Sequence, residues 1–426
     1  MRRTLLFIPL ALVSVLAVLA AGAVASTTQA STGLTVVGPW QGADAASFRA
    51  VLDNFQQRNP GVQVTYTPVS GSVAASLSSA PSGTTTPDVA LLQLPADLSA
   101  MRSMARAGML QPVEFAVPAV RANYAFAWKQ HGSVDGRLYG VFFKATNDSA
   151  FWFNNRDFQN RGVKTLPSTW SGLQRLSDTL SGSGAKPFAL SAESDILLPS
   201  LFQNVYLMQQ GNQRYDRLGR GEIRWTDGSV RDALSSMRSV VAAPARVAGG
   251  LGALENHYAG AVQQVFGTPQ RASLVQGGSA VIPVLRTAKA VRPVTQFSTL
   301  PFPSLNGIGP ARVIGHADAA VMVKDSPAAR ALIGFLATPA SATIWAKRGG
   351  DYLSPNRNVS PGAYGVPAMR TLATALTRAS VFRFGLADLM SPTMRAALNR
   401  ALSQYVRNPA RVAQITAQLD AAARQT

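Results

Sequence analysis

Short apolar, strand-like runs alternate with longer segments of helical periodicity from residue 33 onward, and this order is the strongest restraint on the fold. Strand-like runs cover residues 34–37, 62–66 and 87–92. Between and after them, residues 43–57 and 97–107 carry apolar side chains at helical spacing. A β-α-β-α order of this kind predicts a parallel sheet covered by helices on both faces. In such sheets, ligands bind beyond the carboxyl ends of the strands.

The same rhythm resumes after residue 150, which predicts a second α/β unit. At 426 residues the chain is too long for one ordinary core. Thr169 is a suitable N-cap for a helix that begins at Trp170. Ser326-Pro327 and Thr338-Pro339 set a capping residue before a proline, and they predict helices over 328–337 and 340–347. The segment 391–424 has the pattern of further helices.

The stretch GVFFKATNDSAFWFNN, residues 140–155, places a polar interruption between two bulky apolar runs. One interpretation is a surface loop between two strands of a single sheet. The other is a strand that leaves one core, crosses a gap open to water and enters a second core.

The first 25 residues have the pattern of an export signal. Arg2-Arg3 precede an uncharged apolar run, and Ala23-Val24-Ala25 forms a small-x-small cleavage site before Ser26. The alternative is an uncleaved membrane anchor, since 5–25 is nearly long enough to span a bilayer. The chain has no cysteine, which excludes a lipoprotein anchor, disulfides and cysteine-ligated zinc.

The chain is strongly basic. Without Arg2 and Arg3, the 40 basic residues become 38 against 21 acidic ones, a formal charge of +17. Such a field favours anionic partners, yet the basic residues are scattered singly and form no dense run of the kind that binds nucleic acid. A solubilising surface rich in arginine is the simpler interpretation, and we expect no nucleic-acid partner.

The sequence offers no arrangement typical of a catalytic site. The three histidines, His131, His257 and His316, are far apart and have no metal-binding spacing. No nucleophile elbow and no phosphate-binding loop occur. Glu193 and Asp195 could be taken for the carboxylate pair of a glycoside hydrolase, but residues two apart on a strand point the same way and do not straddle a bond. We therefore expect no enzymatic activity and no cofactor.

Several stretches resemble, in order and spacing, the extracellular solute-binding proteins of sugar-type ABC importers, the family of the maltose- and α-glucoside-binding proteins. They include VVGPWQGADAASFRAVLDNFQQRNPGVQVTYTPVSG, PDVALLQLPADL, DGRLYGVFFKATNDSAFWFNNRDF, LPSTWSGL, DSPAARALIGFLATPASATIWAKRGGDYLSPN and VFRFGLADLMSP. Each is short, and together they extend over most of the chain beyond the signal.

The resemblance implies a two-lobed periplasmic-binding-protein-like α/β fold, each lobe a mostly parallel sheet flanked by helices, with three crossings between the lobes. It places the N-terminal lobe at 30–146 and 302–338 and the C-terminal lobe at 147–301 and 339–426. Residues 144–149 become the first crossing. The implied function is capture of a carbohydrate between the lobes and its delivery to a membrane permease by a monomeric, exported receptor that closes by hinge bending.

A sugar site needs carboxylate, amide or arginine groups beside the ring and aromatic side chains beneath it. Trp40, Gln41 and Gln93 follow predicted strands at the ligand-facing edge of the first sheet. Trp40 could equally seal the core, and Trp152, which alternates out of phase with its neighbours, could equally pack beneath a helix. Asn147 and Asp148 would face the cleft or satisfy the turn. By position in relatives, the remaining candidates are Glu193, Asp195, Gly277, Arg286, Asp351, Tyr352, Arg357 and Asp388.

The sequence also departs from the family pattern. The segment 384–388, FGLAD, lacks the acid and the hydroxyl that α-glucoside relatives tend to place at positions 385 and 387. Fewer aromatic residues are available for stacking. Together with the basic charge, this leaves open a solute smaller than a maltooligosaccharide, or an acidic sugar or surface polymer.

Overall fold

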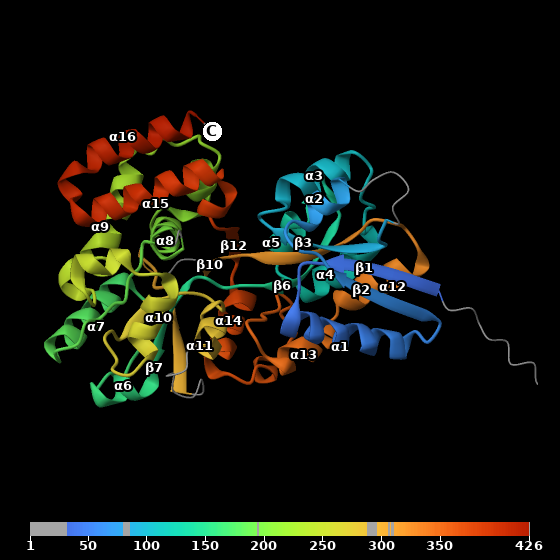
Figure 1. The fold of residues 1–426 in the computed structure, drawn as a ribbon, viewed down its shortest axis with the longest axis horizontal. Helices are drawn as coiled ribbons and strands as arrows, with labels where there is room; N and C mark the ends of the chain where they lie inside the picture. Colours follow the sequence, from blue (N-terminus) through green and yellow to red (C-terminus); the bar gives the residue numbers. More distant parts are fainter. Residues whose placement is uncertain are drawn as a thin grey trace, which may run out of the picture.

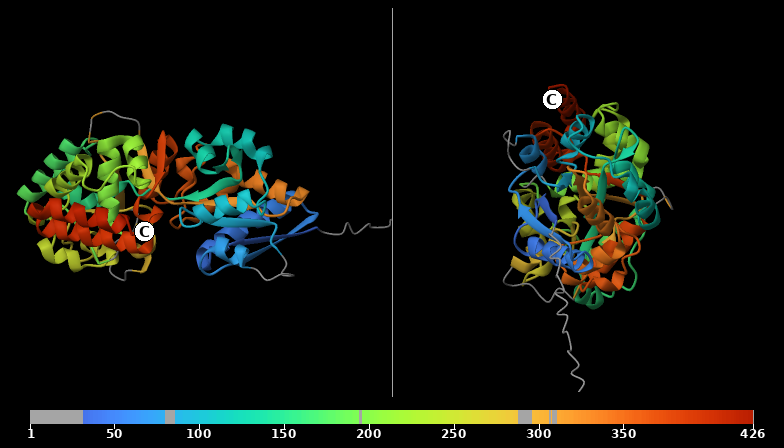
Figure 2. Two further views of the ribbon diagram at one scale, coloured as in Figure 1. Left: turned by 90° about the horizontal axis from the view of Figure 1, so that it is seen from above. Right: turned by 90° about the vertical axis from the view of Figure 1, so that its right-hand side faces the viewer.

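The computed structural model describes residues 32–79, 86–193, 196–287, 296–305, 307 and 311–425, and in these residues the chain forms two α/β lobes. Figure 1 shows the lobes side by side, joined by a few segments near the centre, and Figure 2 shows the same division from above. The predicted α/β class and two-lobed arrangement are confirmed.

A five-stranded sheet forms the centre of the N-terminal lobe, with the strand order β2-β1-β3-β11-β6. Its strands are β1 (Thr32–Gly38), β2 (Val62–Pro68), β3 (Val89–Leu94), β6 (Gly140–Ala145) and β11 (Ala317–Met322). The strands β2, β1 and β3 are parallel, as the β-α-β order predicts, whereas β11 runs antiparallel to both β3 and β6. The short strands β4 (Ser133–Val134) and β5 (Arg137–Leu138) pair separately.

Helices cover this sheet and bury the apolar faces that the sequence pattern marks. They are α1 (Gly42–Arg58), α2 (Val73–Ser78), α3 (Leu98–Arg106), α4 (Val117–Asn123), α5 (Phe126–His131), α12 (Pro327–Leu336) and α13 (Pro339–Arg348). In α1 the predicted apolar stripe, Phe48, Val51, Leu52 and Phe55, is buried. Burial of each such side chain contributes about 2 kcal/mol of stability.

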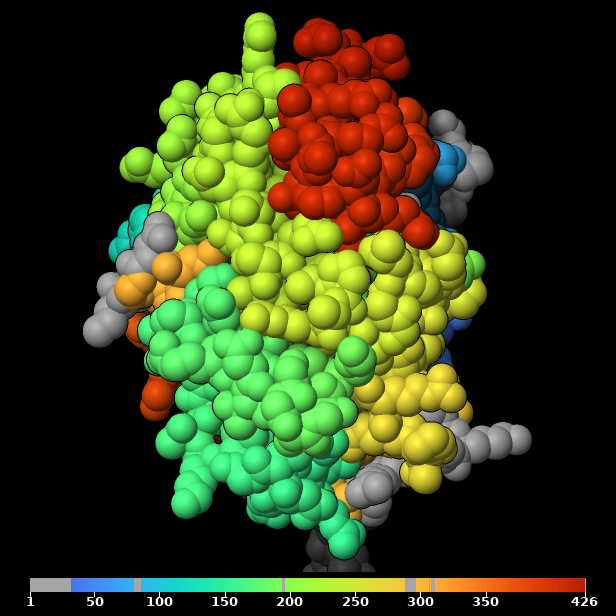
Figure 3. All heavy atoms as spheres, turned by 90° about the vertical axis from the view of Figure 1, so that its left-hand side faces the viewer, coloured from blue at the N-terminus to red at the C-terminus, as the bar shows by residue number. Residues whose placement is uncertain are grey.

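The C-terminal lobe contains a smaller sheet with the order β8-β7-β9, in which both pairings are antiparallel. These strands are β7 (Ala150–Asn154), β8 (Leu274–Gln276) and β9 (Phe297–Pro301). The helices are α6 (Asn155–Asn160), α7 (Trp170–Gly182), α8 (Leu197–Gly219), α9 (Gly228–Val240), α10 (Tyr258–Phe266), α11 (Val281–Thr287), α14 (Pro367–Arg378), α15 (Pro392–Arg407) and α16 (Val412–Ala423). On the outer face in Figure 3, the residues of α15 and α16 lie beside those of the lobe's earlier helices.

The sheets are therefore mixed, and the expectation of a mostly parallel sheet in each lobe is wrong in this detail. The β-α-β rhythm holds only for the first three strands. The strand β11 comes from a distant part of the sequence and enters the sheet in the opposite direction, between β3 and β6. Local periodicity carries no information about such an inserted strand.

The predicted helix starts at Thr169, Ser326 and Thr338 are confirmed. Their side chains accept hydrogen bonds from the backbone N–H groups of Gly172, Ala329 and Ser341. Helix α8 is interrupted at Gly211, whose φ of 80° is available to glycine at little cost. In the described ranges no helix combines the length and apolarity that a bilayer crossing requires. The predicted signal peptide over 1–25, and the alternative anchor, lie outside the described residues.

Two segments between the lobes are hydrogen-bonded to each other. The backbone N–H groups of Thr146 and Asp148 donate to the carbonyl oxygens of His316 (2.9 Å) and Ile314 (2.8 Å). Beside them, β10 (Arg312–Gly315) pairs in parallel with β12 (Val381–Phe384). The chain thus passes between the lobes as a small ribbon of paired backbone, not as independent loops.

The lobe boundaries stay a prediction, and the contacts lead us to propose later positions for two of the crossings. Residues 297–301 pair within the C-terminal sheet, so we place the second crossing at β10, after the predicted boundary between 301 and 302. Helix α13 packs on α1, and α14 packs on β9. We accordingly place the third crossing between α13 and α14, after the predicted boundary at 338.

Candidate functional site

Polar side chains form a row across one edge of the five-stranded sheet. Asp318, at the start of β11, lies opposite Gln93 on β3 and opposite Lys144 on β6. Because β11 runs antiparallel to both neighbours, its start coincides with their carboxyl ends. Trp40 follows β1 at the same edge, and its Nε1 donates to Asp318 Oδ2 at 2.7 Å. This is the edge where the sequence predicts a ligand.

Lys144 is the centre of a charge cluster at this edge. Its Nζ lies 2.7 Å from Asp44 Oδ2, in the first turn of α1, and 3.0 Å from Asp351 Oδ1, after α13. Burial lowers the pKa of Lys144, but the attraction of Asp351, Asp44 and Asp318 outweighs it and leaves the pKa above its ordinary value. Three carboxylates therefore surround one ammonium, and the Asp44 and Asp351 side chains remain 33% and 23% exposed.

Asp318 is the most deeply buried carboxylate of the row. Burial raises its pKa to about 6, although Lys144, the Trp40 N–H group and His316 all favour the ionised form. The group is still largely ionised at neutral pH. A buried carboxylate that is held by hydrogen-bond donors has a fixed position. As an acceptor it can orient a neighbouring polar group.

Buried aromatic side chains pack next to the charge cluster. Trp40 lies edge-on to Phe48 and Trp345, with ring centroids 4.8 and 4.6 Å away. Tyr352 stacks on Trp345 at 4.8 Å and 12°, and its hydroxyl donates to the Phe143 carbonyl oxygen. Both Trp40 and Tyr352 are buried, at 4% and 1% exposure, so they hold the edge in place and offer a ligand little ring surface. For Trp40 this favours the core interpretation.

A second polar group lies on the ribbon between the lobes. His316 Nδ1 is 3.1 Å from Asp148 Oδ2, and its Nε2 is 3.0 Å from Asp388 Oδ2. Burial alone would lower the His316 pKa, but hydrogen bonds and attraction from both carboxylates leave it well above its ordinary value. His316 is therefore a cation that joins the first crossing to the turn after β12. No group of three or more His, Asp or Glu side chains in the described ranges is arranged to hold a metal ion.

Asn147, next to Asp148, faces the interior. It is fully buried, its Nδ2 donates to the Leu372 carbonyl oxygen, and its Oδ1 accepts from the Ser149 N–H group. These contacts satisfy the turn and fix the first crossing against α14. They correspond to the turn interpretation of this residue, not to a ligand contact.

In the C-terminal lobe, Trp152 lies inside the core and not at its surface. It is fully buried, and its Nε1 donates to the carbonyl oxygens of Gly277 (3.1 Å) and Gly278 (3.0 Å). A Cβ on Gly278 would overlap the Asp148 carboxylate, so the glycine pair allows the turn after β8 to approach the crossing closely. Trp152 thus fixes the turn at Gly277-Gly278, and Gly278 lies against Asp148.

The other predicted residues lie in separate places. Arg286 is exposed on α11, and its Nη2 lies 3.6 Å from where a Cβ on Gly349 would be, so it faces the loop that carries Asp351. Glu193 is exposed and paired with His257 at 3.0 Å. Arg357 donates to the carbonyl oxygens of Arg121 and Ala122 at the end of α4. In addition, Gln41 bonds Ser70 Oγ at 3.2 Å, and Asp195 lies outside the described residues.

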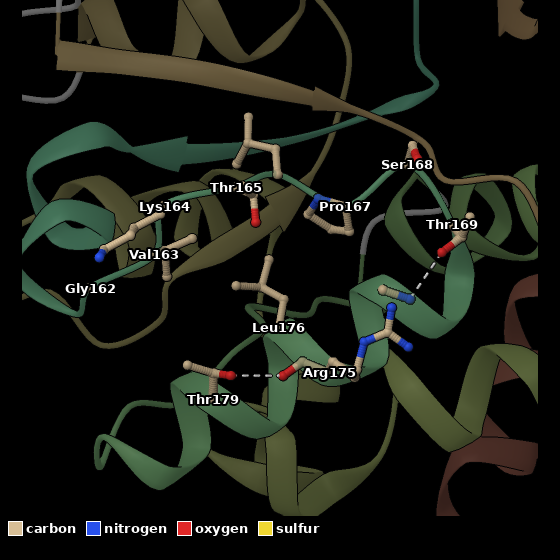
Figure 4. A pocket seen from close by; sticks show the side chains of 12 residues that line it. Gly162, Val163, Lys164, Thr165, Pro167, Ser168, Thr169, Arg175, Leu176 and Thr179 are labelled. Carbon is tan, nitrogen blue, oxygen red and sulfur yellow. Dashed lines mark hydrogen bonds between the residues drawn. The ribbon is translucent and has the colours of Figure 1, made fainter.

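Two of the cavities are distinct from this edge. One, of about 450 Å³, lies between the lobes and is bounded by α3, α5, α8 and β12; there burial lowers the pKa of His131 to about 4. The other, of about 500 Å³, lies between residues 162–169 and α7 (Figure 4). Two of its polar side chains bond to the backbone of α7: Thr179 donates to the Arg175 carbonyl oxygen, and Thr169 accepts from the Gly172 N–H group. No predicted site residue lines either cavity.

The structure thus adds Asp44, Lys144, Asp318 and His316 to the candidates. Lys144 and Asp44 are 100 positions apart, and Lys144 and Asp351 are 207 apart, so no local pattern connects them. One signal was available: a lysine directly after the apolar run 141–143, at the end of a buried strand, is out of place unless carboxylates surround it.

Comparison with known proteins gives consistent matches over most of the chain. The family described as "Bacterial extracellular solute-binding protein" matches residues 39–343. The alpha-glucosides-binding periplasmic protein AglE of Rhizobium meliloti is 27% identical over 84% of this chain and 79% of its own length. The osmoprotective compounds-binding protein GgtB of Synechocystis sp. is 28% identical over 84% of both chains. Among solved structures, the bacterial solute receptor AcbH superposes with a TM-score of 0.78 at 17% identity, over 92% of this chain and 99% of that one.

Proposed function

The chain belongs to the family of bacterial extracellular solute-binding proteins, and from this premise we propose that it captures a neutral carbohydrate between its lobes, at the carboxyl edge of the five-stranded sheet. The proposed contacts are the exposed parts of Asp44, Asp351 and Gln93. Asp148, Asp388 and Arg286 lie on the facing segments. The buried Lys144 and Asp318 hold the edge in its binding geometry.

The sign of the charge at this edge is the observation that carries the proposal. Five carboxylates (Asp44, Asp148, Asp318, Asp351 and Asp388) outnumber the three cations of the site: Lys144 and His316, which between them contact four of the carboxylates, and Arg286 on a facing segment. The excess of acceptors suits the hydroxyl groups of a neutral sugar, which donate to carboxylates. An anionic sugar would meet a net negative site, although the chain as a whole is basic. The acidic-sugar alternative is therefore the less favoured one.

Relatives supply independent support for a carbohydrate. AglE is named for binding α-glucosides, and AcbH is described as having an exclusive substrate preference for β-D-galactopyranose. These preferences differ, and the edge residues of this chain lie on several distant segments. The relatives therefore support a carbohydrate as the ligand of this chain, but they do not indicate which sugar.

The proposed role is binding and delivery, without chemical change of the sugar. Closure of the lobes around a solute stabilises a form that the empty protein can already reach, and the permease of an ABC importer would recognise that closed form. We place the mature chain outside the cytoplasmic membrane and expect it to act as a monomer. Glu193 is paired with His257 at the surface.

Calorimetry with matched sugars tests the proposal. Glucose, galactose, maltose and raffinose are titrated beside glucuronate and galacturonate, each at low and high salt. We expect one-to-one binding of at least one neutral sugar, little changed by salt, and no binding of its acid counterpart. Preferred binding of a uronate, or release of a cleaved product, would contradict the proposal.

A further inference from the structure

A cavity of about 530 Å³ in the C-terminal lobe is lined by three arginines and no carboxylate. Arg312 begins β10, while Arg370 and Arg378 lie on α14. Met208, Phe302 and Val313 provide an apolar part of the wall. The volume is in the range of cavities that hold small organic ligands.

The three guanidinium groups have no anionic partner in the part of the chain that the structure describes. Arg370 Nε donates to the Tyr364 carbonyl oxygen, a neutral acceptor. Arg312 Nε is buried without a hydrogen-bond partner among the described residues, and burial lowers the pKa of this arginine. Elsewhere on the chain, arginines such as Arg383 and Arg161 are paired with aspartates. Arg370 and Arg378 are exposed to water, so the cost of a buried group without a partner lies with Arg312 Nε, and a bound anion would offset it.

We propose that this cavity is a second binding site, for a small organic anion that joins a phosphate monoester to an apolar body. The phosphate would accept from Arg312, Arg370 and Arg378, since guanidinium groups bind phosphate through paired hydrogen bonds. The apolar body would lie against Met208 and Phe302. The site is separate from the acidic edge that we propose for the sugar, and it has the opposite charge.

Two segments that connect the lobes also contribute to the cavity wall. Ser149 belongs to the first crossing, and Arg312 and Val313 belong to β10. Ser149 Oγ accepts from the Ile314 N–H group and donates to Asn204 Oδ1, so the wall is fixed to α8. Hydrogen bonds to the backbone of β10 and to α8 therefore hold this part of the cavity wall in place.

Calorimetry of the full chain tests this site, with phenyl phosphate as the probe. Inorganic phosphate probes the charge alone, and phenol probes the apolar body alone. We expect one-to-one binding of phenyl phosphate, weaker binding of inorganic phosphate and none of phenol. Arg312→Gln and Arg378→Gln should each lower the affinity for phenyl phosphate about tenfold or more, which is the usual effect of removing one charge-assisted contact.

Arg400→Gln is the matched control, because Arg400 is exposed on α15 and does not line the cavity. It should change the affinity less than twofold. Unchanged thermal stability and unchanged sugar affinity of the Arg312 and Arg378 variants would show that the fold and the sugar site are intact. No binding of phenyl phosphate at millimolar concentration, or an equal loss in Arg400→Gln, would overturn the proposal.

Discussion

Lys144 is the residue on which the geometry of the sugar-binding edge most depends. It joins Asp44 on α1 and Asp351 after α13 to the end of β6, and only 10% of its side chain is exposed. Removal of one partner from a buried ion pair leaves the remaining charges uncompensated.

Lys144→Met should therefore lower the free energy of unfolding by about 3 kcal/mol, because Asp44, Asp351 and Asp318 would lose their common cation. Urea denaturation at neutral pH measures this change. Lys347→Met, which removes a lysine from the exposed face of α13, is the control and should change stability by less than about 0.5 kcal/mol. Equal effects of the two variants would contradict the buried cluster.

Asp318 gives stability a distinctive dependence on pH. Burial raises its pKa from 3.8 to about 6, so the folded chain holds a proton between pH 4 and 6 that the unfolded chain has lost. The contribution of Asp318 to the free energy of unfolding is greatest at low pH. It falls as the pH rises from 4 to 6, by at most about 3 kcal/mol.

Asp318→Asn should remove this fall, because the amide stays neutral and can still accept from Trp40 Nε1. The check is denaturation of the wild type and the variant at pH 4, 5, 6 and 7. The exposed Asp53→Asn on α1 is the control and should keep the wild-type profile. A variant profile parallel to that of the wild type would show that Asp318 has an ordinary pKa.

Little of this edge could be predicted residue by residue. The position of Gln93 at the sheet edge could be predicted, because an amide near the end of a buried strand is out of place elsewhere, and its contact with a ligand stays a prediction. Asn147 and Trp152 were candidates by their place near the crossing, yet both are fully buried. Orientation toward the cleft or the core depends on contacts with Leu372 and Gly277, which are distant in sequence and carry no local signal.

At the scale of elements, the segment 144–149 explains the polar interruption between β6 and β7. The two apolar runs belong to different sheets, and the polar residues between them pair with the backbone at 314–316. The local pattern left a surface loop and a crossing open as alternatives, and the resemblance to the solute-binding family implied the crossing. The sequence did not predict the entry of β11 between β3 and β6, or the packing of α13 on α1, because both depend on long-range contacts.

Gly315→Ala should destabilise the ribbon between the lobes. A Cβ at this position would overlap the Thr146 carbonyl oxygen, which is backbone and cannot rotate away. We expect a loss of about 1–3 kcal/mol, the usual cost of overpacking. Gly334→Ala is the control: its Cβ would lie in open space on α12, and alanine should stabilise the helix by about 0.5–1 kcal/mol. Thermal unfolding of both variants measures the difference, and a neutral Gly315→Ala would contradict the close approach.

At the scale of the whole molecule, the distribution of charge matters more than its total. The chain carries a formal charge of +19, but the edge proposed for the sugar is acidic and the second cavity is basic. Composition alone suggested an anionic solute as an open alternative. Only the three-dimensional arrangement separates a basic surface from an acidic binding edge.

Sugar binding should stabilise the two lobes together. A ligand that binds only the folded chain adds about 2.7 kcal/mol to the free energy of unfolding at 100 times its Kd. Equilibrium denaturation with and without the sugar found by calorimetry measures this gain. Stabilisation of one unfolding transition without the other would contradict a ligand held between the lobes.

The position of the bound sugar tests the central claim most directly. A crystal structure of the protein saturated with its sugar should show hydroxyl groups within hydrogen-bond distance of Asp44 or Asp351 on one lobe, and a contact from the C-terminal lobe on the other side. A sugar bound away from the edge formed by Gln93, Asp318 and Lys144, or held by one lobe alone, would contradict the account.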